Sequence, residues 1–134
     1  MSDWNAEVIA EFRANGGKVE RFADAPIVIL NTIGAKSGQL REIPLVAMVD
    51  DDAIVIFASK AGAPSNPDWY YNLKANPEID IEYGTETFRA RLDEMETDAG
   101  QAKLAAMAEL MPQFGEYVES AKPRVIPVFA INRL

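Results

Sequence analysis

The sequence has 134 residues, of which 49% are hydrophobic, and its formal net charge at pH 7 is −8. A chain of this length has room for one hydrophobic core, so we expect a single domain over residues 1–134. The negative charge argues against nucleic acid as a partner, because binding a phosphate backbone requires an excess of Lys and Arg. With neither cysteine nor histidine, the chain cannot form a disulfide, a Ser-His-Asp triad or a zinc site with the usual ligands.

The N-terminal segment and the hydropathy predict a cytoplasmic protein whose partners are small molecules. MSDWNAEVIAEF carries acidic residues where a secretory signal carries basic ones, and no apolar run is long enough for a transmembrane segment. An enzyme with so few catalytic side chains would take its chemistry from a cofactor, and the protein would supply binding and orientation.

The first half of the chain predicts one helix followed by three strands. Apolar residues recur at helical spacing before Gly16-Gly17, so we place the helix at Asp3–Asn15. The acidic turn Asp50-Asp51-Asp52 predicts a hairpin between the last two strands. The three strands, all rich in β-branched residues, are Ile27–Thr32, Ile43–Val49 and Ala53–Ala58.

The second half predicts a further helix, a hairpin, a helical region and a last strand. Asn66-Pro67-Asp68 starts a helix, because it offers a cap, a proline at the first helical position and an acid near the positive end of the dipole. That helix should end at Asn76-Pro77. The remaining elements are strands Ile79–Tyr83 and Thr87–Met95 around Gly84, a helix capped by Thr97, a short helix opened by Pro112, and strand Val125–Ile131.

These elements predict an α+β fold, mainly β, with about six strands and flanking helices. Short turns join most of the strands, which favours an antiparallel or mixed sheet over the long crossovers of a parallel one. We therefore predict a sheet that closes into a small barrel. A doubly wound α/β sheet is the weaker alternative.

The segment NTIGAKSGQLREIPL places a loop suited to an anion directly after the strand Ile27–Thr32. Its glycines let backbone N–H groups converge, and Lys36, Ser37 and Arg41 add side-chain donors. Five basic and two acidic residues give the stretch from Arg13 to Arg41 a net charge of +3. An ordinary solvated turn is the competing interpretation, because Gly and Lys are common in turns.

Two motifs in the sequence resemble the deazaflavin (F420)-dependent nitroreductase family, whose members are also called F420-dependent quinone reductases. The motifs are GAKSGQLREIPL and, after it, FASKAGAPSNPDWYYNLKANPEI. The similarity runs from EFRANGGKV to RVIPVFAIN. It implies a split β-barrel that binds coenzyme F420, a hydride carrier with a phosphodiester and a glutamate-rich tail. The cofactor-binding residues that it implies in the first motif are Lys36, Ser37, Gly38, Arg41 and Pro44.

The second motif contains small residues, which let a backbone approach a flat ring so that N–H groups meet its carbonyl edge. A plain loop between a strand and a helix is the competing interpretation. The family often has two glycines where this chain has Ala61 and Gly62. Trp69 also fits simple core packing at helical spacing, and Asn72 faces either the cofactor loop or only solvent. The cofactor contacts that the resemblance implies here are Ala58, Ser59, Lys60, Ala61, Gly62, Trp69 and Asn72.

MPQFGEY matches the segment that faces the substrate in the family. Members that reduce nitro compounds and quinones can carry tyrosines where this chain has Met111 and Phe114, so the resemblance implies a more apolar pocket. Tyr117 is retained and is a candidate proton donor, or else a partly buried structural tyrosine. The substrate-binding residues implied are Ser59, Met111, Phe114 and Tyr117.

The predicted function is transfer of a hydride from reduced coenzyme F420 to an apolar nitroaromatic, quinone or enone acceptor. The first alternative is an FMN-binding split-barrel reductase, because both cofactors are flat phosphorylated rings. A longer anionic tail favours the deazaflavin, since FMN would not need Lys36 and Arg41 spread over one loop. The second alternative is a non-catalytic carrier of the coenzyme or of a lipid-like ligand.

Overall fold

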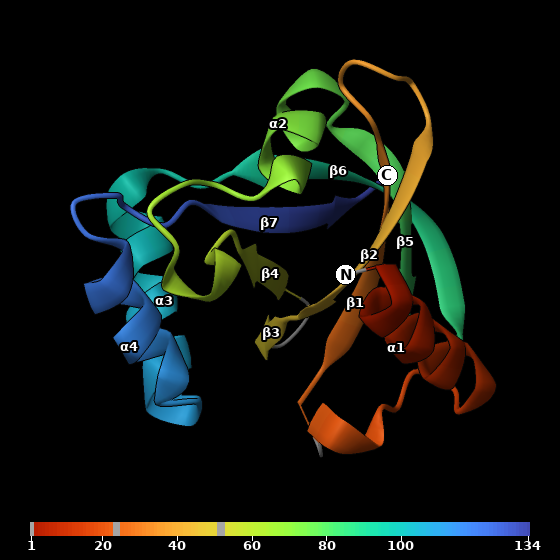
Figure 1. Ribbon diagram of the computed structural model, residues 1–134, viewed down its shortest axis with the longest axis horizontal. Coiled ribbons are helices and arrows are strands. Elements are labelled where there is room, and N and C mark those ends of the chain that lie inside the picture. Colours follow the sequence, from red (N-terminus) through yellow and green to blue (C-terminus); the bar gives the residue numbers. More distant parts are fainter. Residues whose placement is uncertain (1, 23–24, 51–52) are drawn as a thin grey trace.

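The computed structural model describes residues 2–22, 25–50 and 53–134, and within them four α-helices surround one sheet (Figure 1). None of the described helices has the length and apolar composition needed to cross a membrane. The helices are α1 (Ser2–Ala14), α2 (Asp68–Ala75), α3 (Thr97–Leu110) and α4 (Gln113–Ala121), with short 3-10 turns η1 (Glu20–Phe22) and η2 (Lys60–Gly62). The strands are β1 (Ile27–Ile33), β2 (Leu40–Val46), β3 (Met48–Asp50), β4 (Ala53–Phe57), β5 (Glu78–Tyr83), β6 (Glu86–Glu94) and β7 (Val128–Arg133).

The described strands form one sheet in the order β2-β1-β5-β6-β7-β4-β3, and every neighbouring pair is antiparallel. The two strands at the ends of this order, β2 and β3, are separated in the sequence by Ala47 alone. The sheet therefore curls into a half-barrel (Figure 1). The predicted α+β fold, a mainly β split barrel with flanking helices, is confirmed. Of the two sheet types expected, antiparallel and mixed, the sheet is antiparallel.

The strand predicted at Ile43–Val49 is in fact two strands, which is why the sheet has seven described strands and not six. β2 pairs with β1, whereas β3 forms the expected hairpin with β4. Ala47 between them is fully buried and donates its N–H to the oxygen of Pro26 at 2.9 Å. Its small side chain fits this buried corner, where the chain passes from one end of the strand order to the other. The predicted turn residues Asp51 and Asp52 lie outside the described residues.

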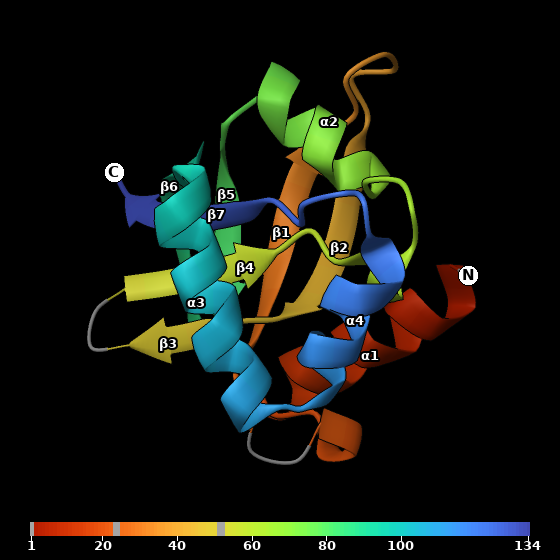
Figure 2. The ribbon, with the colours of Figure 1, turned by 90° about the vertical axis from the view of Figure 1, so that its left-hand side faces the viewer.

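Strands β1 and β4 are buried on both faces, and this explains their continuous apolar runs. In each strand, alternate residues point into the curl of the sheet: Val28 and Leu30, with Ile54 and Ile56. On the outer face of β1, Ile27 and Ile29 pack against α1. On the outer face of β4, Val55 and Phe57 pack against α3 and α4. Figure 2 shows α3 lying across this face, with α2 at one end of the half-barrel.

Several element boundaries differ from their predictions, and three of them have a clear physical reason. Thr97 is the first helical residue of α3, and Glu96 takes the cap position. Pro67 occupies the cap position of α2, while the Asn66 side chain accepts a hydrogen bond from Arg124 at 2.7 Å and does not cap the helix. The last strand begins at Val128, not at Val125, because the preceding Pro127 has no N–H to contribute to a ladder.

Candidate functional site

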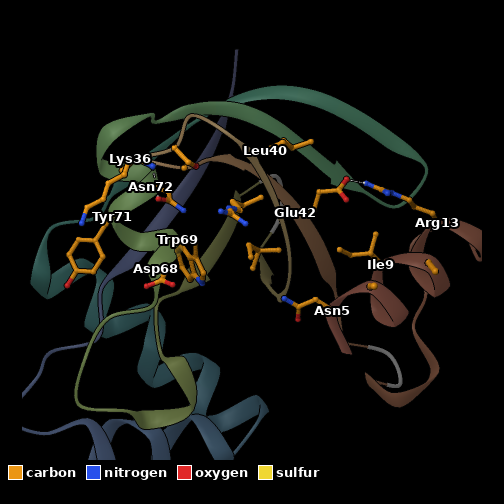
Figure 3. Close-up of a pocket in the computed structure, with 17 residues that line it drawn as sticks. Asn5, Ile9, Arg13, Lys36, Leu40, Glu42, Asp68, Trp69, Tyr71 and Asn72 are labelled. Carbon is orange, nitrogen blue, oxygen red and sulfur yellow. Dashed lines mark hydrogen bonds and ion pairs between the residues drawn. The ribbon is translucent and has the colours of Figure 1, made fainter. Parts of the chain in front are cut away.

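A cleft of about 1250 Å³ lies between α1 on one side and α2 on the other (Figure 3). Asn5 and Ile9 of α1 face Asp68 and Trp69 of α2 across it. Trp69 is only 7% exposed, and its ring centre lies 6.0 Å from that of Phe129, so the core fixes this wall. The volume exceeds the roughly 300–1,000 Å³ of an ordinary small-molecule pocket. The cleft therefore has room for a ligand with an extended part.

The loop between β1 and β2, residues 34–39, is called the anion loop together with Leu40 and Arg41 at the start of β2, and it borders the cleft. The N–H of Gly34 donates to the oxygen of Gln39 at 2.8 Å, and the N–H of Gly38 donates to the oxygen of Gly34 at 2.9 Å. Gly38 has a φ of +70°, which glycine adopts without strain. The Ser37 hydroxyl accepts a hydrogen bond from the Gln39 N–H at 3.1 Å. Ser37 thus stabilises the turn as well as lining the cleft.

Lys36 and Arg41 supply positive charge to the cleft. Both side chains are exposed and line it, and neither has a carboxylate partner within the described ranges. Asn72 ties the anion loop to α2, because its Oδ1 accepts a hydrogen bond from the Ala35 N–H at 2.9 Å. Asn72 therefore faces the loop rather than bulk solvent alone.

Arg13 of α1 lies at the far end of the cleft, where two carboxylates already balance its charge (Figure 3). Its Nε and Nη2 donate to Glu82 at 2.9 and 2.7 Å, and Nη2 also donates to Glu42. These hydrogen bonds raise the pKa of Arg13 above its ordinary value. Lys36 and Arg41 are therefore the residues of this basic stretch that line the cleft with no carboxylate partner among the described residues.

The ion pair of Glu82 predicts a loss of stability in acid. Its hydrogen bond from Arg13 holds the pKa of Glu82 below the usual 4.5, although partial burial acts in the opposite direction. Because the folded pKa is the lower one, the stabilisation is complete above the unfolded pKa and is lost as the pH falls through the folded pKa. Glu82→Gln should lower the urea midpoint at neutral pH and flatten its decline between about pH 5 and about pH 3. Glu116→Gln, which removes one exposed charge on α4, is the control, and equal acid sensitivity of the Glu82 variant and wild type would contradict the assignment.

The segment after β4, residues 58–63, is called the ring loop here and has a strained backbone. Lys60, Ala61 and Gly62 have φ values of +47°, +53° and +81°. For Lys60 and Ala61 this left-handed conformation costs about 1 to 2 kcal/mol each, so neighbouring groups must hold it. A Cβ added to Gly62 would lie 3.0 Å from the Cα of Tyr117. The glycine therefore lets the ring loop lie directly against α4.

None of the predicted substrate residues on and before α4 lines the cleft, and Tyr117 is the one that lies against Gly62 of the ring loop. Phe114 is 6% exposed and packs edge-on against Phe57 at 5.6 Å and Tyr117 at 5.3 Å between ring centres. Met111 and Tyr117 are partly buried against the same cluster. Phe114 is thus part of the core between β4 and α4, while Tyr117 borders the ring loop.

The predicted cofactor residues fall into two groups and two outliers. Gly38 lies in the anion loop without lining the cleft, and Pro44 is buried in β2 opposite Ile29. The group in the cleft is Lys36, Ser37, Arg41, Trp69 and Asn72. The group in the ring loop is Ala58, Ser59, Lys60, Ala61 and Gly62. The ligand contacts of all these residues stay predictions.

Two parts of the site escape sequence analysis. Asn5 and Ile9 of α1 line the cleft, but a helical pattern reveals only which face of α1 is buried, not what its edge borders. Arg124 donates hydrogen bonds to carbonyl oxygens of the ring loop. Its one signal in the sequence is a charged residue at the start of the apolar run RVIPVFAI.

Comparison with known proteins shows the family of this chain. The family model of the F420H(2)-dependent quinone reductase matches residues 4–132. An F420H(2)-dependent quinone reductase of Mycobacterium tuberculosis is 43% identical over 81 residues, which make up 59% of this chain and 54% of that protein. The chain thus spans about half the length of the curated relatives it matches.

Two solved structures share the fold over most of this chain. An F420-H2 dependent reductase, FDR-A, has a TM-score of 0.71 and 34% identity, and the match covers 80% of this chain and 94% of that one. A protein solved as a domain-swapped dimer has a TM-score of 0.72 and 32% identity over 98% of each chain. The family model covers nearly the whole sequence, and the likeness to FDR-A supports the same family. The chain belongs to the F420H(2)-dependent quinone reductase family.

Proposed function

We propose that this chain is an oxidoreductase that uses reduced coenzyme F420 to reduce an apolar quinone, nitroaromatic or enone. The observation that carries the proposal is the pair of exposed cations, Lys36 and Arg41, on a hydrogen-bonded loop at the edge of a large cleft. Neither has a carboxylate partner among the residues that the structure describes. Membership of the family and the likeness to FDR-A support the same coenzyme.

The residues present fit a ligand with a flat ring and an anionic tail. A guanidinium can pair bidentately with phosphate or carboxylate, and an ammonium adds a point charge, so Arg41 and Lys36 match the phosphodiester and the glutamates. Trp69 offers an aromatic surface in the same cleft. FMN carries one phosphate and no glutamates, so it would satisfy fewer of these groups.

When bound, coenzyme F420 supplies the hydride, and the residues of this chain bind, orient and shield the reacting groups. Lys36 and Arg41 would hold the tail, and the backbone of the ring loop would hold the edge of the ring. Met111, just before α4, would contribute apolar surface for the acceptor. Tyr117 is the candidate donor of a proton to the acceptor, because it is half-buried and borders Gly62.

Titration of the purified protein with coenzyme F420 and with FMN tests the proposal. We expect the deazaflavin to bind more tightly, and steady-state assays with quinone, nitroaromatic and enone acceptors should show its oxidation. FMN as the tighter ligand by a factor of ten, about 1.4 kcal/mol, would support the FMN reductase instead. Tight deazaflavin binding without turnover of any acceptor would support a carrier.

Lys36→Ala and Arg41→Ala should each weaken binding of coenzyme F420 by about 1 to 3 kcal/mol, the range for hydrogen bonds to charged groups that are shielded from water. Turnover at saturating coenzyme should change little, since these residues contact the tail and not the reacting atoms. Isothermal titration at low salt measures the loss, and added salt should weaken the wild type more than either variant.

A deazaflavin riboside without phosphate or glutamates separates tail binding from a general loss of fold. Wild type and both variants should bind the riboside alike. Lys74→Ala is the matched lysine control, because Lys74 lies on α2 outside the cleft lining and pairs with Glu94 at 2.9 Å. If Lys36→Ala and Arg41→Ala bind the full coenzyme as wild type does at low salt, the anion loop is only a turn.

A further inference from the structure

The ring loop is held from behind by a single side chain, Arg124, which lies between α4 and β7. Its Nη1 donates to the oxygen of Ala58 at 3.0 Å and to Oδ1 of Asn66 at 2.7 Å. Its Nη2 donates to the oxygens of Ser59 and Ala63, both at 2.8 Å, and its Nε donates to Ala63 at 3.0 Å. One guanidinium therefore ties together both ends of a loop that lies more than sixty positions away in the sequence.

The charge of Arg124 is balanced by dipoles and not by an acid. Within the part of the chain that the structure describes, no carboxylate forms an ion pair with it. The side chain is partly buried, and desolvation lowers the pKa of the guanidinium from its ordinary value. Such a position costs free energy, and the hydrogen bonds to carbonyl oxygens compensate for it.

The hydrogen bonds within the ring loop leave three of its N–H groups available for a ligand. The N–H groups of Gly62 and Ala63 donate within the loop, to Ser59 at 2.9 Å and Lys60 at 3.1 Å. Among the described residues, the N–H groups of Ser59, Lys60 and Ala61 have no hydrogen-bond partner. Ser59 is right-handed and the next two residues are left-handed. Successive N–H groups in such an alternation converge on one point and bind a negatively polarised oxygen.

We propose that Arg124 is a positioning residue, which holds the ring loop so that the N–H groups of Ser59, Lys60 and Ala61 converge on an oxygen at the edge of the cofactor ring. The inference rests on the proposed function, because that function brings a ring to this loop. The three N–H groups and the positive charge behind them favour an oxygen that carries negative charge. Arg124 acts through the backbone and does not itself contact the ligand.

A guanidinium-rescue experiment on the coenzyme-free protein tests the first part of the proposal. The Arg124 side chain is only partly buried, so an added guanidinium ion can reach the vacated site from solvent. In Arg124→Ala, the amide resonances of Ser59 to Ala61 should shift, and the hydrogen-bonded amides of Gly62 and Ala63 should exchange with solvent about tenfold faster or more. Millimolar guanidinium, but not sodium, should reverse the change. Arg124→Lys keeps the positive charge but lacks the planar guanidinium, so it should give the same amide shifts less strongly. It replaces the alanine variant if that variant does not fold.

The second part is read from the affinity for a deazaflavin riboside, which lacks the tail. Arg124→Ala should weaken riboside binding about tenfold, equivalent to 1.4 kcal/mol, and guanidinium should restore it. Arg89→Ala, an exposed arginine of β6 paired with Asp80, is the matched control and should change neither readout. Unchanged loop amides in a folded Arg124 variant, or shifted amides with unchanged riboside affinity, would overturn the proposal. If wild type binds no deazaflavin at all, the proposed function fails, while the amide readout still decides whether Arg124 holds the loop.

Discussion

Phe129→Ala is expected to lower the free energy of unfolding by about 3 to 5 kcal/mol, the range for truncating a buried phenylalanine. Phe129 of β7 is 1% exposed, and its ring centre lies 6.0 Å from Trp69 and 5.7 Å from Tyr70. The cavity left by its ring would open beneath α2, which the sheet cannot close because β7 is paired on both sides. Urea unfolding followed by circular dichroism measures the loss.

The same substitution should also reach the cleft, because Trp69 and Asn72 lie on α2 above the vacated space. We expect weaker coenzyme binding in Phe129→Ala even at temperatures where the variant is folded. Phe129→Leu keeps most of the volume and should cost clearly less stability than the alanine variant. A loss below about 1 kcal/mol for Phe129→Ala would show that Phe129 does not support α2 as the structure indicates.

Gly62→Ala is expected to cost about 2 to 5 kcal/mol, because two unfavourable effects add. The left-handed φ of +81° strains any residue with a Cβ, by about 1 to 2 kcal/mol. The new Cβ would also lie 2.8 Å from the Cβ of Ser120 and 3.0 Å from the Cα of Tyr117, and such overpacking costs about 1 to 3 kcal/mol more. Thermal unfolding of the variant provides the measurement.

Gly84→Ala separates the two effects. Gly84 has a φ of +62°, but a Cβ placed there meets no atom within 4 Å. It therefore carries the conformational strain alone, partly offset by about 0.4 to 1 kcal/mol from a more restricted unfolded chain. Equal losses for Gly62→Ala and Gly84→Ala would mean that α4 moves away from the ring loop without resistance.

The sheet could be predicted from the sequence largely because the apolar pattern of each strand records whether one or both of its faces are covered. The runs of β1 and β4 are apolar throughout because both faces are covered, whereas β5 and β6 alternate because one face meets water. The corner at Ala47 could not be read, since it interrupts the backbone direction without interrupting the apolar pattern. A pattern of side chains records burial, and burial continues through Ala47.

The site could be predicted only where its chemistry is local in the sequence. Lys36 and Arg41 stand a few residues apart in one loop, so their shared role in the cleft was visible. Arg13 was counted as a further cation, but Glu82 on a distant strand balances it, and charge counts along the chain cannot show that. The role of Arg124 was hidden for a related reason, because its partners are mostly backbone carbonyls, which every residue has.

The position of β7 has a consequence for how the chain assembles. Residues 128–133 follow all the other described strands in the sequence, yet they pair in the middle of the sheet, between β6 and β4. During synthesis, β6 and β4 are therefore made before the strand that pairs with them, and their edges have unpaired backbone groups until β7 is made. Such edges are templates for pairing with another chain. The sheet is complete only when β7 pairs with both β6 and β4, and such non-local pairing is slow and leaves a chain open to aggregation until it forms.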